Sequence, residues 1–193
     1  LQTILDGVEE NLNSRMFMFI PRDQACYYDK PDVIGRKFVW AFSRGPKQAI
    51  FEMSEACRCY AVSRWTACVF HCMRVTEFGL RKLFRLAGAK LPIKGSGGPH
   101  SRRSRYHIEF ATWDVVITQI RKKISDCRTR NPGDRREQRL QFFSALVDHC
   151  EYMKDMWRNE VSHTRRVYNK EEALAAISRV HDFMELVAST PPK

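Results

Sequence analysis

Arg158, Asn159 and His163 are the residues of this sequence whose types and spacing best suit acid–base chemistry on a charged substrate. Arg158 carries a permanently charged, planar guanidinium that can bind a phosphate through two nitrogens at once. His163 carries an imidazole that takes up and releases protons near neutral pH. Because Asn159 precedes His163 by four residues, the two side chains are neighbours on a helix, and the amide can hold the imidazole in one orientation.

This combination suits the cleavage of RNA without a metal ion. Such cleavage removes a proton from the ribose 2′-hydroxyl, stabilises the charge that develops on the phosphate, and gives a proton to the departing oxygen. The alternative is a polar helix face in contact with water. Positions five apart, such as Arg158 and His163, point about 140° apart on an ideal helix. They can therefore reach one phosphate only if the helix is distorted near its end or if two chains share the site.

The residues that position this group belong to a long helical pattern from about residue 136 to residue 163. With Trp157 at the centre of the buried stripe, Asn159 falls on the opposite side of the helix. The predicted stripe consists of Phe143, Leu146, Cys150, Met153, Trp157 and Val161. A final helix is predicted to start at Asn169, because Glu172 follows three residues later as in a capping box.

Three other segments complete the predicted fold. The apolar pattern of residues 48–86 predicts one long helix or two helices, ended by a glycine. The pattern of residues 111–127 predicts another helix. Residues 1–13 predict a short amphipathic helix, followed by extended segments and turns that pack on the core. We therefore expect an all-α protein with an irregular N-terminal layer over residues 1–47 and a bundle of four main helices over residues 48–193. The inward-facing residues of the segment 111–127 are predicted to be Trp113, Val116, Ile117, Ile120 and Ile124.

The composition narrows the class of protein. The 193 residues are 44% hydrophobic and carry a formal net charge of +11, which favours an anionic partner such as nucleic acid over a basic surface without a specific partner. No apolar run approaches the roughly 20 residues that cross a bilayer, and the acidic N-terminal stretch does not resemble a secretory signal. Seven cysteines, an odd number, favour reduced thiols in a cytoplasmic protein.

Basic residues are concentrated around the segment 111–127. A basic run, Arg121-Lys122-Lys123, lies within it, and two arginine-rich connections flank it. The connections are predicted to hold the RNA backbone, and the alternative is that charged loops simply face water. The arginines predicted to bind RNA are Arg102, Arg103, Arg105, Arg128, Arg130, Arg135 and Arg136.

The pattern Arg158-Asn159-x-x-x-His163, late in a long helix of a helical bundle, resembles the R-N-x-x-x-H motif of the HEPN superfamily (higher eukaryotes and prokaryotes nucleotide-binding). The stretch EACRCYAVSRWTACVFHCMRVTEFGL also resembles the second helix of an uncharacterised bacterial branch of these proteins. The resemblance covers roughly residues 52–188. It implies a metal-independent endoribonuclease without a cofactor, which acts as a homodimer with two motifs in one basic cleft and serves as a toxin or antiviral effector.

By the same resemblance, Arg158 contacts the scissile phosphate, His163 performs the acid–base chemistry and Asn159 orients it. RNA and a second copy of the chain are the implied partners, with an antitoxin or regulatory protein as a further one. Other members of the superfamily are inactive modules that bind RNA, nucleotide or protein, and this second function stays open. In some members a modified tyrosine lies two residues after the histidine, where this chain has Arg165, and its nearest tyrosine is Tyr168.

Arg74 and Glu77 form a polar cluster with His71 within the helical segment 48–86. Because Arg74 and Glu77 are three residues apart, we expect an ion pair at the border of the core. The alternative is that one of them contacts the Arg158 end of the neighbouring helix and supports the site from behind.

Cysteines in the same segment raise the question of a zinc site, and hence of a zinc-stabilised DNA-binding protein. They are Cys57, Cys59, Cys68 and Cys72, with His71 between the last two. However, Cys68 and Cys72 lie on an apolar stripe, and no matching pair of C-x-x-C hairpins occurs. Buried free thiols are therefore favoured, and no metal is expected.

Overall fold

The computed structural model describes residues 2–15, 18–29, 47–92, 107–128, 134–162 and 166–189. Every regular element within these ranges is helical, which confirms the all-α fold class. The HEPN-like arrangement of the bundle stays a prediction. No helix in these ranges combines the length and the apolar character that crossing a membrane requires.

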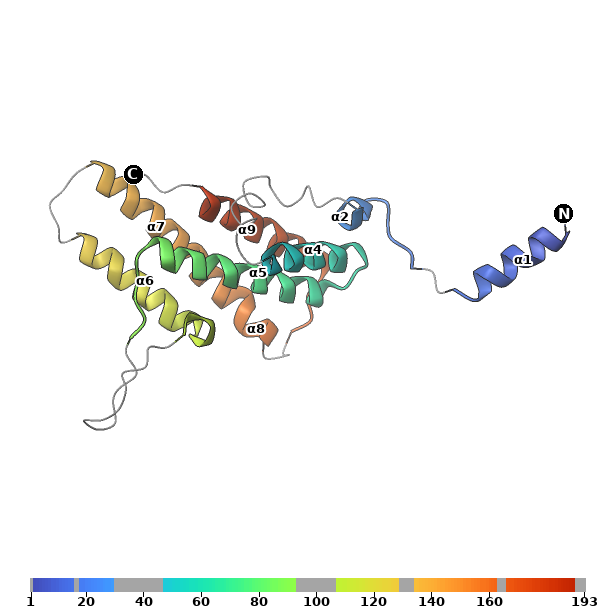
Figure 1. The fold of residues 1–193 in the computed structure, drawn as a ribbon, viewed down its shortest axis with the longest axis horizontal. Helices are drawn as coiled ribbons and strands as arrows, with labels where there is room; N and C mark the ends of the chain where they lie inside the picture. The colour runs from blue at the N-terminus through green and yellow to red at the C-terminus, as the bar shows by residue number, and fades with distance from the viewer. Residues whose placement is uncertain are drawn as a thin grey trace, which may run out of the picture.

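The helices assemble into an elongated bundle from which α1 extends (Figure 1). Their bounds, in chain order, are α1 (Gln2–Asn13), α2 (Ala25–Asp29), α4 (Gln48–Ala61), α5 (Trp65–Leu86), a 3-10 helix (Ile108–Phe110), α6 (Trp113–Arg128), α7 (Asp134–Met153), a π-helical turn (Lys154–Arg158), α8 (Asn159–Ser162) and α9 (Lys170–Ala188).

The segment 48–86 forms two helices, α4 and α5, which pack on each other as a hairpin. Ser63 takes the left-handed conformation between them (φ 59°), and the backbone N–H of Arg64 donates to the carbonyl oxygen of Cys59 at 2.8 Å. Gly88 takes the same conformation after α5 (φ 65°), as the predicted glycine stop requires. A residue in the left-handed conformation commonly ends a helix, because it turns the chain so that the next backbone N–H groups can bond to the last carbonyl groups of the helix.

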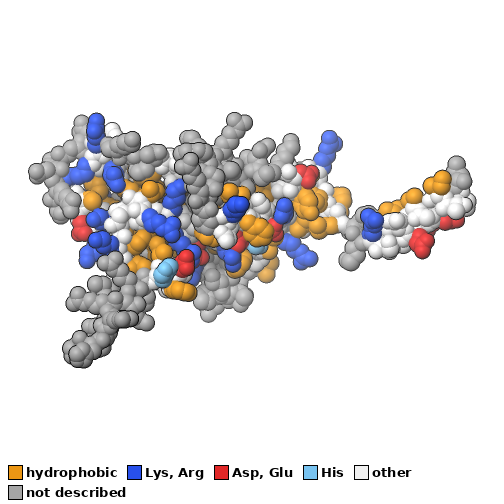
Figure 2. Space-filling view, in the orientation of Figure 1, with side chains coloured by type: hydrophobic (Ala, Val, Ile, Leu, Met, Phe, Trp, Pro, Cys, Tyr) orange, Lys and Arg blue, Asp and Glu red, His pale blue; other side chains and the backbone are white. Residues whose placement is uncertain are grey.

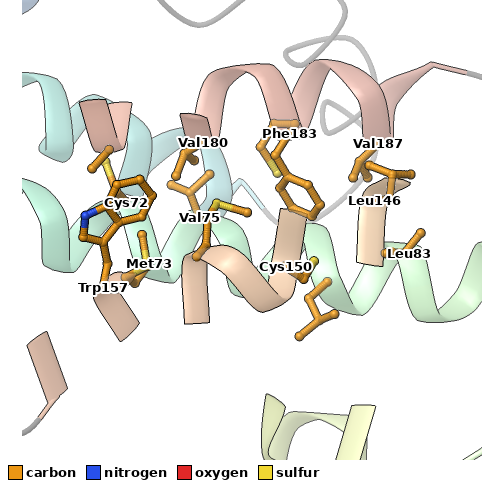
Figure 3. Packing of buried hydrophobic residues seen from close by; sticks show 14 of the residues in the cluster. Cys72, Met73, Val75, Leu83, Leu146, Cys150, Trp157, Val180, Phe183 and Val187 are labelled. Atoms are coloured by element: carbon orange, nitrogen blue, oxygen red, sulfur yellow. The ribbon is translucent and has the colours of Figure 1, made fainter. Parts of the chain in front are cut away.

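Helix α5 is at the centre of the bundle and contacts α4, α6, α7 and α9. Figure 3 shows buried side chains of α5, α7 and α9 interleaved in one core. Gly79 allows α9 to approach α5, since a β-carbon at this position would lie 2.4 Å from Cε1 of Phe183 and 2.6 Å from Sδ of Met184. Helix α9 begins with the predicted capping box, in which Oδ1 of Asn169 accepts the backbone N–H of Glu172 at 2.9 Å.

The predicted buried stripes agree with the structure wherever the side chains are described. All five inward-facing residues of α6 are buried. On α7 and the π turn, the buried members of the predicted stripe are Phe143, Leu146, Cys150, Met153 and Trp157. The side chain of Val161 lies outside the described part.

The N-terminal part differs from the predicted layer. Helix α2 forms where an extended segment was expected, and it packs on α4, with the ring of Tyr27 4.6 Å from that of Tyr60. In contrast, no residue of α1 is buried. Residues 30–46 lie outside the described part, and the domain boundary near residue 47 stays a prediction.

Four cysteines are buried as free thiols, as expected for Cys68 and Cys72, and the other two are Cys57 and Cys150. Burial raises the pKa of the Cys57 thiol to about 12 and that of Cys150 well above its usual value. Within the described residues, no three His, Cys, Asp or Glu side chains are grouped so that they could hold a metal ion.

We expect iodoacetamide at pH 8 to label Cys26, which is exposed, long before the four buried cysteines. The thiolate is the reactive species, and the raised pKa of Cys57 keeps that thiol protonated from pH 8 to pH 10. Mass spectrometry of the labelled peptides measures each rate, with urea-unfolded protein as the reference in which all seven cysteines react. Rapid labelling of Cys57 in the native protein would contradict the packing of α4 against α5.

Candidate functional site

The helix that carries Arg158 changes its geometry immediately before the predicted motif. Helix α7 ends at Met153, the π turn occupies Lys154–Arg158, and α8 begins at Asn159. A π turn contains more residues per turn than an α-helix, and such turns are frequent at functional sites. The π turn changes the direction in which Arg158 points relative to α7, but Asn159–Ser162 is α-helical, so the predicted convergence of Arg158 and His163 still requires a change after Ser162 or a second chain.

Packing against α5 anchors the π turn. Met153 is fully buried, and Trp157, four residues later, is only 6% exposed. Trp157 lies over α5 at Cys72 and Met73 (Figure 3). On the same side, Oγ1 of Thr76 donates to Sδ of Met153 at 3.6 Å. The inner face of the turn is therefore held by the core, and its outer face carries Arg158.

Carboxylates of α7 that precede the motif are bound to helix α6. Arg121 contacts Glu151 at 2.7 Å and Asp148 at 2.8 Å. The guanidinium of Arg121 lowers the pKa of the Glu151 carboxyl. Arg121 belongs to the basic run predicted from the sequence, but its charge is neutralised here and is not free for RNA.

Among the described residues, Arg158 has no such partner. Lys154, one turn earlier, binds Asp114 of α6 at 2.6 Å, and this contact raises the pKa of its ammonium group. No hydrogen bond or ion pair joins Arg158 to another residue that the structure describes. Its side chain is half-buried and that of Asn159 is exposed. Within the described part of the chain, neither the guanidinium of Arg158 nor the amide of Asn159 has a side-chain hydrogen bond or ion pair.

The third member of the motif, His163, lies outside the described residues together with Arg165. The contact between Asn159 and His163 therefore stays a prediction. Tyr168, which follows, is 2% exposed, its backbone N–H donates to Oγ1 of Thr66 at 3.2 Å, and burial raises the pKa of its phenol. A phenol in this environment is not accessible to a modifying enzyme.

Arg74 and Glu77 are both paired, but not with each other. Nε of Arg74 lies 2.7 Å from Oε1 of Glu52 on α4, and Glu77 binds Arg81 at 2.8 Å. The predicted pair is therefore wrong, because Arg74 reaches across to a carboxylate on the neighbouring helix. No hydrogen bond or ion pair joins either residue to Arg158 within the described part of the chain, and their supporting role in the site stays a prediction.

Glu52 was not singled out from the sequence, although it is 4% exposed and charged. Its Oε2 lies 2.7 Å from Nδ1 of His71, while Arg74 binds its other oxygen. A signal was present, since Glu52 lies three residues after Ala49 and four before Ala56, on the buried stripe of α4. A carboxylate at such a position needs a cation from a neighbouring helix.

The arginines predicted to bind RNA fall into three groups. Arg128, at the end of α6, and Arg135, at the start of α7, are exposed as predicted. Arg136 is half-buried, and its Nε and Nη1 are shielded from solvent without a hydrogen-bond partner among the described residues. The others, which lie outside the described residues, are Arg102, Arg103, Arg105 and Arg130.

A basic hollow of about 480 Å³ lies beside the end of α5 and the outer face of α6. Lys90, Lys122 and Lys123 line it together with one carboxylate, Asp126. The left-handed Gly88 turns the chain after α5 so that Lys90 joins the lysines of α6. Three ammonium groups around one hollow suit phosphate groups, and lysine and arginine side chains are frequent over this part of the surface (Figure 2).

Two features thus define the candidate site from geometry alone. One is the pair Arg158 and Asn159, which is unpaired within the described residues and follows a π turn. The other is the basic end of the bundle, where α5, α6 and α7 meet. The chain matches no family model, and no curated protein or solved structure is significantly similar to it.

Proposed function

We propose that the protein is a metal-independent endoribonuclease of HEPN type, in which Arg158 binds the scissile phosphate and His163 transfers protons. Asn159 orients the imidazole. The observation that carries the proposal is the π turn that ends at Arg158, whose guanidinium has no partner in the described part of the chain.

The proposed reaction is an attack of the ribose 2′-oxygen on the adjacent phosphorus. A neutral imidazole removes the 2′-hydroxyl proton, and the bond from phosphorus to the 5′-oxygen breaks as an imidazolium protonates that oxygen. Arg158 stabilises the negative charge on the phosphate oxygens. The products are a 2′,3′-cyclic phosphate and a 5′-hydroxyl. Since one imidazole accepts a proton while another donates one, two copies of His163 are needed, and a homodimer supplies them.

Exposed apolar residues next to the motif support association of two copies. Tyr152 and Met156, which precede Arg158 by six and two residues, are 45% and 42% exposed. The ring of Tyr152 meets that of Trp157 edge to face at 5.7 Å, which fixes its position at the surface. A second copy that covers these side chains would bring two motifs together. We propose that the RNA backbone binds at two places. One is the pair of exposed arginines Arg128 and Arg135, and the other is the lysine-lined hollow.

The resemblance alone suggests the biological role. A HEPN-type ribonuclease of this kind would act in the cytoplasm as a toxin or antiviral effector, and an antitoxin or regulatory protein would restrain it. The contacts described above support a phosphate-binding surface.

The test is cleavage of a mixed-sequence RNA pool in EDTA by the wild type, Arg158→Ala and His163→Ala. We expect the wild type to leave cyclic-phosphate ends and each variant to be slower by about a hundredfold or more. Arg58→Ala serves as the matched control, because Arg58 is a surface arginine on α4 whose ion pair within the described residues is with Glu55. Thermal unfolding by circular dichroism verifies that all the variants fold.

Cleavage by His163→Ala at the wild-type rate would contradict the proposal. If no protein cleaves RNA but all bind it with an affinity that falls steeply with salt, the inactive binding module becomes the better description.

A further inference from the structure

A second and smaller pocket lies at the junction of α5, α6 and α7, and we propose that it receives helix α1 of a second copy of this chain. The pocket measures about 190 Å³, below the roughly 300–1,000 Å³ of typical small-molecule sites. It therefore suits the anchoring side chains of a partner protein. Its lining combines apolar residues with three cations: Ala87, Ile124, Cys127, Leu140 and Phe143 with Lys123, Arg136 and Arg139.

Arg136 indicates the chemistry of the occupant. Its Nε and Nη1 are shielded from solvent and have no hydrogen-bond partner among the described residues. A buried donor without an acceptor is unfavourable, and a charged one more so. A carboxylate arriving with a partner would supply two acceptor oxygens in the geometry that a guanidinium prefers. Arg139 is already engaged in part, with its guanidinium 5.5 Å from the centre of the Phe143 ring.

Helix α1 has the complementary properties. All four residues of its apolar stripe are exposed: Ile4, Leu5, Val8 and Leu12. Its charged residues are all acidic: Asp6, Glu9 and Glu10. Figure 2 shows the hydrophobic side chains along one side of α1 and the carboxylates along the other. An acidic helix with an exposed apolar stripe thus occurs in the same chain as an apolar pocket with a cationic rim.

The register of α1 selects Glu9 as the partner of Arg136. At about 100° per residue, Glu9 lies about 40° beyond Leu5, while Leu12 lies within about 20° of Leu5. Leu5 and Leu12 can therefore enter the pocket while the carboxylate of Glu9 reaches the guanidinium at its edge. Asp6 points about 100° away from Leu5 and stays outside this contact.

The pocket lies far from the point where the N-terminal segment is attached to the bundle. Asp23 is bound to Lys170 at the start of α9 (2.7 Å), and this region adjoins the start of α5 through the bond from Tyr168 to Thr66. The pocket includes Ala87, just after the other end of α5. Helix α5 has 22 residues and hence a length of about 33 Å.

The connection leaves little slack for α1 to reach the pocket of its own chain. Ten residues, 14–23, join α1 to its point of attachment, and fully extended they span at most about 36 Å. Part of this length is used in a turn, where the backbone N–H of Gln24 donates to the carbonyl oxygen of Pro21 at 2.9 Å. A second copy is not subject to this limit, and two copies can exchange their α1 helices reciprocally.

Charge reversal in the full chain tests the proposal by sedimentation velocity over a range of protein concentrations. We expect Glu9→Arg and Arg136→Glu each to raise the dissociation constant of the dimer at least tenfold, because each pair occurs twice in a reciprocal dimer. The double variant should return to within a few-fold of the wild type. The matched controls are Asp6→Arg on the other side of α1 and Arg128→Glu at an exposed site, and both should leave the constant unchanged.

Mixing the two single variants identifies the exchange. The arginine introduced at position 9 of one chain then meets the glutamate introduced at position 136 of the other. The native Glu9 and Arg136 meet in the second contact, so a heterodimer should form. The proposal would be overturned if either single variant associated as tightly as the wild type, or if the mixture formed no heterodimer. It would also be overturned if α1 docked on the pocket of its own chain. Loss of RNA binding in Arg136→Glu with unchanged self-association would also overturn it. The proposal does not depend on ribonuclease activity.

Discussion

Replacing Gly79 with valine is expected to lower the free energy of unfolding by about 3 kcal/mol, at the upper end for overpacked cores. The β-carbon alone would lie 2.4 Å from Cε1 of Phe183 and 2.6 Å from Sδ of Met184. Both residues are almost completely buried, so the ring of Phe183 cannot move aside without displacing its neighbours. The methyl groups of valine extend the overlap, and α5 and α9 must separate.

Helix propensity acts in the opposite direction but is weaker. Glycine in the interior of a helix is about 1 kcal/mol less favourable than alanine, so any side chain at Gly79 would help an isolated helix. The overlap with Phe183 exceeds this gain. Gly7→Ala is the matched control, since nothing lies within 4 Å of a β-carbon at Gly7 in α1. That variant should increase helix content and leave the unfolding of the bundle unchanged.

Urea titrations followed by circular dichroism measure the effect. In addition, shortening Phe183 to leucine in the Gly79→Val background should recover part of the loss, because substitutions at sites in contact are not additive. A Gly79→Val protein as stable as the wild type would contradict the close approach of α9 to α5.

Replacing Arg74 with methionine is expected to destabilise the protein by about 3 kcal/mol, the lower end for breaking a buried ion pair. Arg74 itself is half exposed, but its partner Glu52 is buried. Removal of the guanidinium leaves the Glu52 carboxylate with His71 as its one other described partner. The remaining contact with His71 keeps the loss at the lower end of the range.

Arg81→Met on the same helix is the matched control. Arg81 pairs with Glu77, whose side chain is 38% exposed, and also donates to the carbonyl oxygen of Glu109 at 3.4 Å, so the loss should be smaller, about 1 kcal/mol. The double variant Arg74→Met with Glu52→Gln should regain most of the stability, because it removes the buried charge as well as its partner. Equal losses of unfolding free energy for Arg74→Met and Arg81→Met in urea titrations would contradict the prediction, because they would show that the burial of Glu52 does not strengthen its ion pair.

The predictions that agree with the structure depend on neighbours in sequence. The stripes of α6 and α7 follow from apolar residues at intervals of three and four, and the start of α9 follows from Asn169 and Glu172. Asn159 was likewise placed on the outer side of a helix by the position of Trp157, and it is exposed. These features are local, because a helical turn brings together only residues that are close along the chain.

The sequence by itself thus determined the main helices and their buried faces, and it supplied the hypothesis about the chemistry of Arg158 and Asn159. Tertiary structure decided the rest. The π turn depends on how Met153 and Trp157 fit against α5, and the partner of Arg74 depends on Glu52 of another helix. Likewise, the shielded guanidinium of Arg136 and the exposed stripe of α1 emerge only when the packing of the bundle is known. In each case the deciding contact joins residues far apart in the chain, and helical periodicity carries no information about such contacts.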